Sequence, residues 1–269
     1  MSAVRVAIIG ATGRMGQAML RAMAEFAPLQ LHAALTNEGD PGVGQDAGVQ
    51  AGVGALGITV GTDVAASVRG ANVVIDFSSA AVTRTHIDAC VAAQVPLFIG
   101  TTGLDAATFA AVDVAAARIP ILVAANTSLA LNVLLALVRR AAAALPDGYD
   151  IEIFESHHKH KVDAPSGTAL VLGRAAAQGR GISLAEPVQL TGAVAGPRQP
   201  GSIGFSVARG GDVVGEHQVR FLGPGEQLLL EHVATDRTLF ARGALTGASW
   251  LAGKPAGRYE MSDVLSIKT

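Results

Sequence analysis

The stretch Glu155–Leu170 reads ESHHKHKVDAPSGTAL and collects side chains that can transfer protons. Five of its first seven residues are cationic or can become so: His157, His158, Lys159, His160 and Lys161. Imidazole changes charge near neutral pH, so a histidine in this window can act as a general acid or base. The cationic residues predict that the substrate or ligand is an anion.

The residues that follow this window are typical of a helix N-terminus. Asp163–Thr168 reads DAPSGT, which supplies cap residues and a first turn. Helix N-termini expose unpaired N–H groups and favour anions. Ser166 and Thr168 add hydroxyl donors, and Gly167 lets a ligand come close. We therefore predict a carboxylate or phosphate cradle, with Lys161 and two histidines directed at it, for a small anion that is protonated during reaction.

A metal site and a solvated run of charge are the alternatives for this window. Imidazole is a common zinc ligand, but adjacent His157 and His158 point to opposite sides of an extended chain. Lys159 and Lys161 would repel a cation. The single cysteine, Cys90, lies far away in an apolar segment and is predicted to be a buried packing residue. We expect no metal.

A second chemical motif lies near the N-terminus, where Gly10–Gly16 reads GATGRMG directly after the apolar run Val4–Ile9. Glycines allow a tight turn and close approach of a pyrophosphate, whose charge the following helix N-terminus stabilises. The place of the motif in a first βαβ unit is the context that a dinucleotide fingerprint requires. We predict dinucleotide binding; a purely structural turn is the alternative.

The choice between NAD and NADP is left open by the sequence. The fingerprint expects an acidic residue about 20 positions further on, where the chain has Thr36, Asn37 and Glu38. Thr36 cannot replace a carboxylate, and Arg14 in the glycine loop is the nearest cation. We expect a neutral site that binds both NADH and NADPH with modest discrimination.

Two later strand ends carry similar features, Phe98–Gly103 (FIGTTG) and Ala124–Ser128 (AANTS). Ligands of open α/β sheets bind beyond the carboxyl ends of the strands. Thr101, Thr102 and Asn126 are therefore candidates to hold a nicotinamide carboxamide or ribose. Capping and turn formation is the alternative, and we favour it for Ser128, which also precedes a predicted helix.

The first half of the chain alternates strand-like and helix-like segments, which predicts a parallel sheet covered on both faces. A glycine-rich passage, Gly39–Gly57, lacks periodicity and is predicted to be a mobile loop. The predicted strands are Val4–Ile9, Leu29–Leu35, Val73–Phe77, Pro96–Ile99 and Ile119–Ala124, and the predicted helices are Gly13–Phe26, Ala81–Ala93 and Asp105–Ala117.

The second half has an α+β pattern, and we place the boundary near Thr127. A helix is predicted from Ser128 to about Leu145, a strand over Tyr149–Glu155 and a helix from about Ser166. Residues 202–234 are predicted to form three antiparallel strands in a meander, with turns at 209–212 and 223–226. The last predicted helix, Arg237–Leu251, fits either half on pattern alone.

Composition bounds the function further. Hydrophobic residues make up 50% and charged residues 16%, enough for a substantial core, and the formal net charge of −2 argues against a nucleic-acid partner. The most apolar run, Leu129–Val138, is far shorter than the roughly 20 residues of a membrane span. No signal peptide is evident. We expect a cytoplasmic protein that binds neither nucleic acid nor membrane.

Taken together, GATGRMG, IGTTG, AANTS and ESHHKHKVDAPSGTAL resemble the 4-hydroxy-tetrahydrodipicolinate reductase family, also called dihydrodipicolinate reductase. The long motif matches E-x-H-H-x-x-K-x-D-A-P-S-G-T-A, and GSIGFSVARGGDVVGEH at 201–217 extends the resemblance over essentially the whole chain. The resemblance implies reduction of a cyclic dicarboxylate by NADH or NADPH in the diaminopimelate and lysine pathway. It also implies a Rossmann-like α/β domain, 1–127 completed by 238–269, and an α+β substrate domain, 128–237, whose open mixed sheet forms a homotetramer.

The resemblance also implies roles for particular residues. His157 and Lys161 are expected to be catalytic proton donors, and the substrate is expected at His158, Lys161, Ser166, Gly167 and Thr168. Cofactor contacts are expected at Gly10, Ala11, Thr12, Gly13, Arg14, Met15, Thr36, Asn37, Gly100, Thr101, Thr102, Ala124, Ala125, Asn126 and Thr127. Thr36-Asn37 departs from the acidic residue and Arg that some members carry. A different NAD(P) oxidoreductase with an anionic substrate and a non-catalytic nucleotide sensor are the alternatives.

Overall fold

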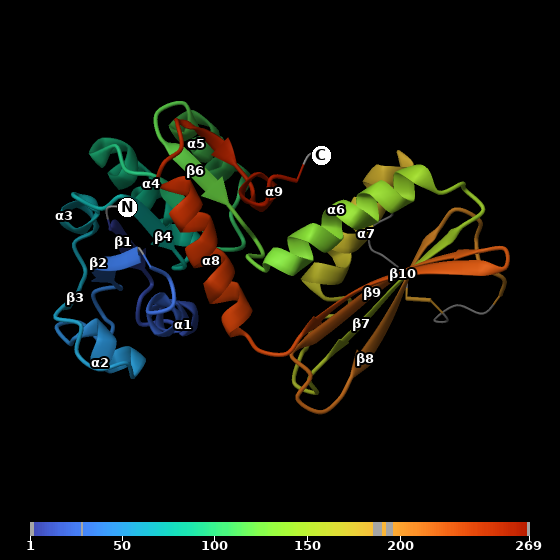
Figure 1. Ribbon diagram of the computed structural model, residues 1–269, viewed down its shortest axis with the longest axis horizontal. Coiled ribbons are helices and arrows are strands. Elements are labelled where there is room, and N and C mark those ends of the chain that lie inside the picture. The colour runs from blue at the N-terminus through green and yellow to red at the C-terminus, as the bar shows by residue number, and fades with distance from the viewer. Residues whose placement is uncertain (1–2, 28, 185–189, 192–195, 268–269) are drawn as a thin grey trace. The chain divides into compact units, whose positions relative to one another are not determined.

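The computed structural model describes residues 3–27, 29–184, 190–191 and 196–267 of the 269-residue chain. These residues form two compact units (Figure 1). Unit 1 comprises Met1–Leu129 and Thr238–Lys268, and unit 2 comprises Ala130–Arg237. Each unit has its own hydrophobic core, and the sites below are described within one unit at a time.

Unit 1 is built on a parallel sheet of seven strands in the order β11-β6-β5-β4-β1-β2-β3. The chain leaves the central strand β1 first toward β2 and later toward β4, so the topology switches direction at β1, where open α/β sheets bind ligands. The strands are β1 (Val4–Ile9), β2 (Leu29–Leu35), β3 (Val60–Gly61), β4 (Val73–Asp76), β5 (Leu97–Ile99), β6 (Pro120–Val123) and β11 (Gly257–Tyr259).

Helices cover both faces of this sheet, as the sequence predicted, because its strands are apolar on both sides. Ile8 packs with Met19 of α1 and Leu245 of α8 on one face, whereas Ile9 packs with Ile87 of α4 on the other. The helices are α1 (Arg14–Met23), α2 (Ala47–Ala51), α3 (Val64–Val68), α4 (Ala80–Ala93), α5 (Ala106–Ala116), α8 (Thr238–Leu251) and α9 (Met261–Val264).

The last long helix, α8, packs within unit 1 and lies beside α1 (Figure 1). A Cβ atom added to Gly243 would lie 1.7 Å from the carbonyl oxygen of Thr127, so only glycine permits this approach. The Thr127 hydroxyl donates a hydrogen bond to the Phe240 carbonyl oxygen (2.7 Å). This contact joins Thr127 to helix α8 within unit 1. The sequence pattern alone could not decide to which half of the chain this helix belongs.

Unit 2 is a four-stranded mixed sheet, in the order β10-β9-β7-β8, with two helices on one face (Figure 1). Ile153, Phe205 and Val219 from the sheet pack against Leu134 of α6 and Leu172 of α7. The elements are α6 (Leu129–Ala144), β7 (Asp150–His157), α7 (Gly167–Arg180), β8 (Ile203–Arg209), β9 (Gly215–Gly223) and β10 (Glu226–Ala234).

The predicted three-stranded meander is wrong in one respect. β9 and β10 form the expected antiparallel hairpin, but β8 pairs in parallel with β7, and β7 separates it from β9. The segment predicted as a hairpin turn at 209–212 instead crosses the end of β7, where Gly210 N donates to the His157 carbonyl and His158 N donates to the Val213 carbonyl. Alternation predicts a strand but not its partner.

The segment Gly39–Gly57, predicted to be a mobile loop without periodicity, contains the short helix α2, which the sequence did not predict. The Asp46 carboxylate accepts hydrogen bonds from the amides of Gly48, Val49, Leu56 and Gly57, which caps α2 and closes the loop on itself. The short elements β3, α3, β11 and α9 were not predicted, because two to five residues are too few to show a period.

Candidate active site

The candidate acid–base residue His157 and its buried partner Glu155 lie on the helix-covered face of β7. Alternate residues of this strand are buried, and Glu155 and His157 follow Ile151 and Ile153 on that face. The strand extends two residues beyond its predicted end, so the first histidine of the cationic window belongs to the sheet. Only 9% of the His157 surface is exposed.

Glu155 organises this centre. Its side chain is fully buried, and the carboxylate accepts hydrogen bonds from His157 Nδ1 (2.6 Å) and from the Ser166 backbone N–H (2.9 Å). Arg209 of the neighbouring strand adds two more, to Oε2 (2.7 Å) and Oε1 (2.8 Å). Burial alone would raise the pKa of Glu155, but the hydrogen bonds from Arg209, His157 and Ser166 outweigh it and lower the pKa.

His217 of β9 packs against His157 from the side, with ring centroids 5.1 Å apart in an edge-to-face arrangement. Its Nε2 atom forms a hydrogen bond with the Ser166 hydroxyl (3.0 Å), and its Nδ1 atom is buried with no hydrogen-bond partner among the described residues. Burial, followed by the nearby His157, lowers the pKa of His217 to about 4. His217 is therefore neutral at physiological pH.

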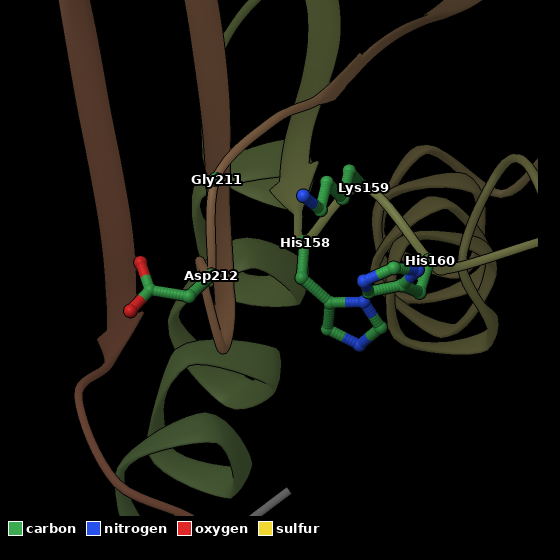
Figure 2. Close-up of a pocket in the computed structure, with 5 residues that line it drawn as sticks. All are labelled: His158, Lys159, His160, Gly211 and Asp212. Carbon is green, nitrogen blue, oxygen red and sulfur yellow. The ribbon is translucent and has the colours of Figure 1, made fainter.

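His158 faces an open pocket together with His160, and Figure 2 shows their rings side by side and the Asp212 carboxylate turned away from them. The His158 and His160 ring centroids are 6.3 Å apart. Arg237 Nη2 lies 3.2 Å from His158 Nε2 and can only donate, so this nitrogen accepts and the proton of the neutral ring is on Nδ1. Partial burial, then Arg237 and His160, lower the pKa of His158, which favours that neutral form.

The Lys161 ammonium group is paired with the carboxylate of Asp163 in this structure. Its ammonium group donates to both carboxylate oxygens of Asp163, at 2.7 and 2.8 Å. Asp163 is well exposed, and this ion pair is solvated on one side. An anionic ligand would therefore compete with Asp163 for Lys161.

The predicted cradle is present at the start of α7. Ser166 is the N-cap, and its hydroxyl accepts from the Ala169 N–H (3.1 Å). This hydroxyl is buried and already bonded to His217, so Ser166 shapes the cradle rather than presenting a free donor. Gly167 is exposed, and a Cβ there would meet nothing within 4 Å, so the space in front of the first helical amides is open. Thr168 is half-buried beside it.

The glycine loop of unit 1 has the shape that a dinucleotide fingerprint requires. Gly10 has φ +83°, and a Cβ there would lie 2.4 Å from the Phe77 carbonyl oxygen. A Cβ on Gly16 would lie 2.2 Å from the Gly10 carbonyl oxygen, so α1 approaches the turn closely. Gly13, the N-cap of α1, supplies no side-chain cap, which leaves the helix N-terminus to a ligand. These residues fit a pyrophosphate.

The predicted cofactor residues lie at the carboxyl ends of β1, β2, β5 and β6, which meet at one edge of the sheet. The exposed ones can offer their side chains: Arg14, Asn37 and Thr102. Gly13 and Ala125 are exposed as well, Gly100, Ala11 and Ala124 are buried, and Met15, Thr36 and Asn126 are half-buried. The hydroxyls of Thr101 and Thr127 donate to main-chain oxygens of unit 1, so these two would reach a ligand through their backbone.

A buried polar network supports the turn at Gly100. Asp76, at the end of β4, is fully buried, and its carboxylate binds His86 Nδ1 (2.8 Å), the Ser78 hydroxyl (2.5 Å) and the Thr101 hydroxyl (3.3 Å). A Cβ on Gly100 would lie 2.1 Å from the Phe77 ring. Asp76 thus joins the loops after β4 and β5.

A carboxylate lies close to Thr36, where the sequence predicted a neutral ribose site. That both cofactors bind with modest discrimination stays a prediction. The Thr12 hydroxyl lies 2.7 Å from the Thr36 hydroxyl and donates to the Asp40 carboxylate (2.8 Å). Asp40 comes four residues after the position where the fingerprint expects its acid, and the loop folds back to bring it there.

Comparisons with known proteins decide the family. Models of the dihydrodipicolinate reductase N-terminus and C-terminus match residues 4–127 and 130–265. The chain belongs to the dihydrodipicolinate reductase family. It is similar to the 4-hydroxy-tetrahydrodipicolinate reductase of Thiobacillus denitrificans, 48% identical over 98% of this chain and 99% of that one. The enzyme of the same name from Ruegeria sp. is 47% identical, over 97% and 98% of the two chains.

A solved structure, the dipicolinate-bound dihydrodipicolinate reductase from a Paenisporosarcina species, has a similar fold. It is 21% identical, with a TM-score of 0.76, and covers 99% of this chain and 100% of its own. The Rossmann-like parallel sheet and the separate mixed sheet of this dihydrodipicolinate reductase family member confirm the predicted fold class.

Sequence reasoning missed Glu155, Arg209, His217, Asp40 and Asp76 as parts of the two sites. One signal was available, because Glu155 and His157 are two residues apart on a strand and must share a face. Arg209 was interpreted as the start of a turn, and nothing in the sequence brings His217 or Asp40 to its partners. Within the described residues no cluster of three or more metal-ligating side chains is present, and no helix is long and apolar enough to span a membrane.

Proposed function

We propose that this protein is an NAD(P)H-dependent oxidoreductase that reduces 4-hydroxy-tetrahydrodipicolinate to tetrahydrodipicolinate in lysine biosynthesis by the diaminopimelate route. One observation carries the proposal beyond family membership. The buried Glu155 carboxylate binds both the ring of His157 and the N-cap amide of the α7 cradle. A proton-transferring group and an anion site are therefore fixed to each other within unit 2.

The substrate is a cyclic dicarboxylate, and unit 2 offers donors for both carboxylates. The amides of Gly167 and Thr168 would bind one carboxylate, helped by the positive end of the α7 dipole. His158 Nδ1, which is buried without a hydrogen-bond partner among the described residues, and Lys161, released from Asp163, would bind the rest. Ser166 would keep the cradle in shape.

The reaction removes water from the substrate and adds one hydride and one proton to the conjugated imine that results. NAD(P)H, held by the residues of unit 1 named below, would provide the hydride. His157 and Lys161 would donate the proton that completes the reduction. One hydride and one proton together deliver two electrons and two protons, which is the amount that reduction of one double bond requires. Glu155 keeps the His157 ring oriented with Nδ1 on the carboxylate and Nε2 on the other side of the ring.

The cofactor would be held in unit 1. The Gly10–Met15 loop would bind the pyrophosphate, the backbone and side chains at Gly100–Thr102 and Ala124–Thr127 would bind the nicotinamide end, and Thr36 and Asn37 would lie near the adenosine ribose. The close-packed glycines and the uncapped α1 N-terminus support this assignment.

The test is oxidation of NADH and NADPH by the purified protein with freshly generated 4-hydroxy-tetrahydrodipicolinate. We expect substrate-dependent oxidation and formation of tetrahydrodipicolinate. Activity with an aspartate-semialdehyde or homoserine substrate instead would favour another oxidoreductase. Tight cofactor binding without oxidation in the presence of any cyclic imine dicarboxylate would favour a nucleotide sensor and refute the proposal.

We further propose a homotetramer assembled through the unit 2 sheet in the cytoplasm. Among the described residues no helix covers the second face of this sheet, and the edge strand β10 exposes Leu229 (46%) and Val233 (50%) there. Self-association would bury these side chains. Light scattering after size exclusion should give four times the 27.2 kDa chain mass, and a monomeric mass would refute this assembly.

A further inference from the structure

The cofactor loop of unit 1 holds a carboxylate that the fingerprint spacing does not predict. Thr36 stands at the end of β2, where an acidic residue is expected, and Asp40 lies on the loop that follows. Asp40 Oδ2 accepts from the Thr12 hydroxyl at 2.8 Å, and Thr12 belongs to the glycine loop. The carboxylate is therefore connected directly to the residues that would surround the adenosine ribose.

The direction of the hydrogen bonds among these three residues follows from their chemistry. An ionised carboxylate only accepts, so the single proton of the Thr12 hydroxyl goes to Asp40. Thr36 must then donate to Thr12 across the 2.7 Å contact. The chain of hydrogen bonds therefore runs from Thr36 through Thr12 and ends on the Asp40 carboxylate, which keeps further lone pairs to accept from a ligand.

The loop holds Asp40 in place independently of any ligand. Its second carboxylate oxygen accepts from the Gly42 N–H at 2.8 Å, which forms a tight local turn. A Cβ on Gly42 would lie 2.8 Å from the Thr12 methyl group, so the loop packs directly on the glycine motif. The Gly42 and Thr12 hydrogen bonds lower the pKa of Asp40. The carboxylate is therefore charged at neutral pH.

The other charges nearby are Arg14 and Glu38, and both are exposed. Arg14 occupies the first position of α1, and among the described residues no ion pair joins it to Asp40. Glu38 carries the same charge as Asp40 and lies on the same loop, but among the described residues it forms no hydrogen bond with Thr12 or Thr36. Asp40 is the acid connected to the ribose end.

We propose that Asp40 replaces the missing acid of the fingerprint, accepts a hydrogen bond from the ribose 2′-hydroxyl of NADH, and disfavours the 2′-phosphate of NADPH. This inference deepens the proposed function and rests on it, because it concerns the same cofactor site. A carboxylate accepts from a hydroxyl but repels a phosphate, so a residue at this place discriminates by charge as well as by hydrogen bonding.

Binding measurements test the inference without turnover. Fluorescence titration of the full chain should give a dissociation constant for NADH at least about tenfold below that for NADPH, the cost of placing two like charges together. Competition by 5′-AMP and 2′,5′-ADP isolates the ribose end, and 5′-AMP should bind more tightly. Two ratios of dissociation constants are compared, NADPH to NADH and 2′,5′-ADP to 5′-AMP. The variants Asp40→Asn and Asp40→Ser should bring both ratios at least about fivefold closer to one, whereas the matched control Glu38→Gln should leave them unchanged.

The outcomes separate this inference from the proposed function. Equal binding of 5′-AMP and 2′,5′-ADP to the wild-type protein, with normal substrate-dependent oxidation, would overturn the inference alone. Tighter binding of NADPH would overturn it as well. Failure to bind either dinucleotide would overturn both. The ratio of the 2′,5′-ADP to the 5′-AMP dissociation constant in the wild-type protein tests the inference even if the Asp40 variants fold poorly. Circular dichroism shows whether the variants are folded.

Discussion

Glu155 Oε2 lies 2.6 Å from Nδ1 of His157, two residues away on the same face of β7. A carboxylate only accepts, so this contact fixes a proton on Nδ1, and Nε2 is the ring nitrogen that does not face Glu155. Because Arg209 and the Ser166 amide bind the same carboxylate, the orientation of His157 is linked to the position of the α7 cradle.

The first prediction concerns this orientation. Glu155→Gln should lower kcat about 10- to 100-fold, because the neutral amide has one acceptor oxygen instead of two and holds the His157 ring and Arg209 less firmly. Steady-state kinetics measure this loss.

Glu152→Gln is the matched control for that variant. Glu152 lies on the same strand, points to the opposite face, and is also paired with an arginine, Arg198. We expect kcat of this control to stay within about threefold of the wild type. If both variants lose activity equally, Glu155 acts only through the stability of the fold.

The second prediction concerns the proton donors themselves. His157→Gln and Lys161→Ala should each lower kcat by roughly 10²–10⁴, the usual contribution of a general acid or base. Lys159→Ala, which changes an exposed lysine two residues away, should leave kcat within about threefold of the wild type. Losses below threefold for both His157→Gln and Lys161→Ala would remove the pair from the mechanism.

The third prediction concerns stability in acid. The pKa of His217 is lowered to about 4, mainly by burial, so the unfolded chain takes up a proton on this ring near pH 6.5 and the folded chain does not until about pH 4. The free energy of unfolding should therefore fall between these values as the pH decreases. The 2.5-unit difference corresponds to at most about 3 kcal/mol.

Urea denaturation at a series of pH values measures this loss. His217→Gln removes the titrating group, so its free energy of unfolding should depend less steeply on pH than that of the wild type between pH 6.5 and 4. Parallel curves for the two proteins would show that His217 is not buried in its neutral form.

The fourth prediction concerns the return of α8 to unit 1. Gly243→Ala places a Cβ against the Thr127 carbonyl, a main-chain atom that cannot rotate away. Overpacking of this kind should lower the free energy of unfolding by about 1–3 kcal/mol. Gly253→Ala, at an exposed site where a Cβ meets nothing within 4 Å, is the control. Equal thermal midpoints for both variants would contradict the close contact between α8 and Thr127.

The amino-acid sequence by itself determined the features that depend on neighbours along the chain. The glycine loop after β1, the helix cap at Ser166 and most strand and helix bounds follow from periodicity, caps and glycines within a few residues. The motif at Glu155–Leu170 was sufficient to predict acid–base chemistry beside an anion cradle, because its residues are contiguous.

Only the tertiary structure decided which distant residues meet. Arg209 reaches Glu155 because β8 pairs in parallel with β7, and His217 reaches Ser166 because β9 lies on the other side of β7. Asp40 reaches Thr12 because a loop folds back over the glycine motif. These pairings depend on how the whole chain closes and packs, whereas a local pattern records only that a strand, a cap or a loop exists.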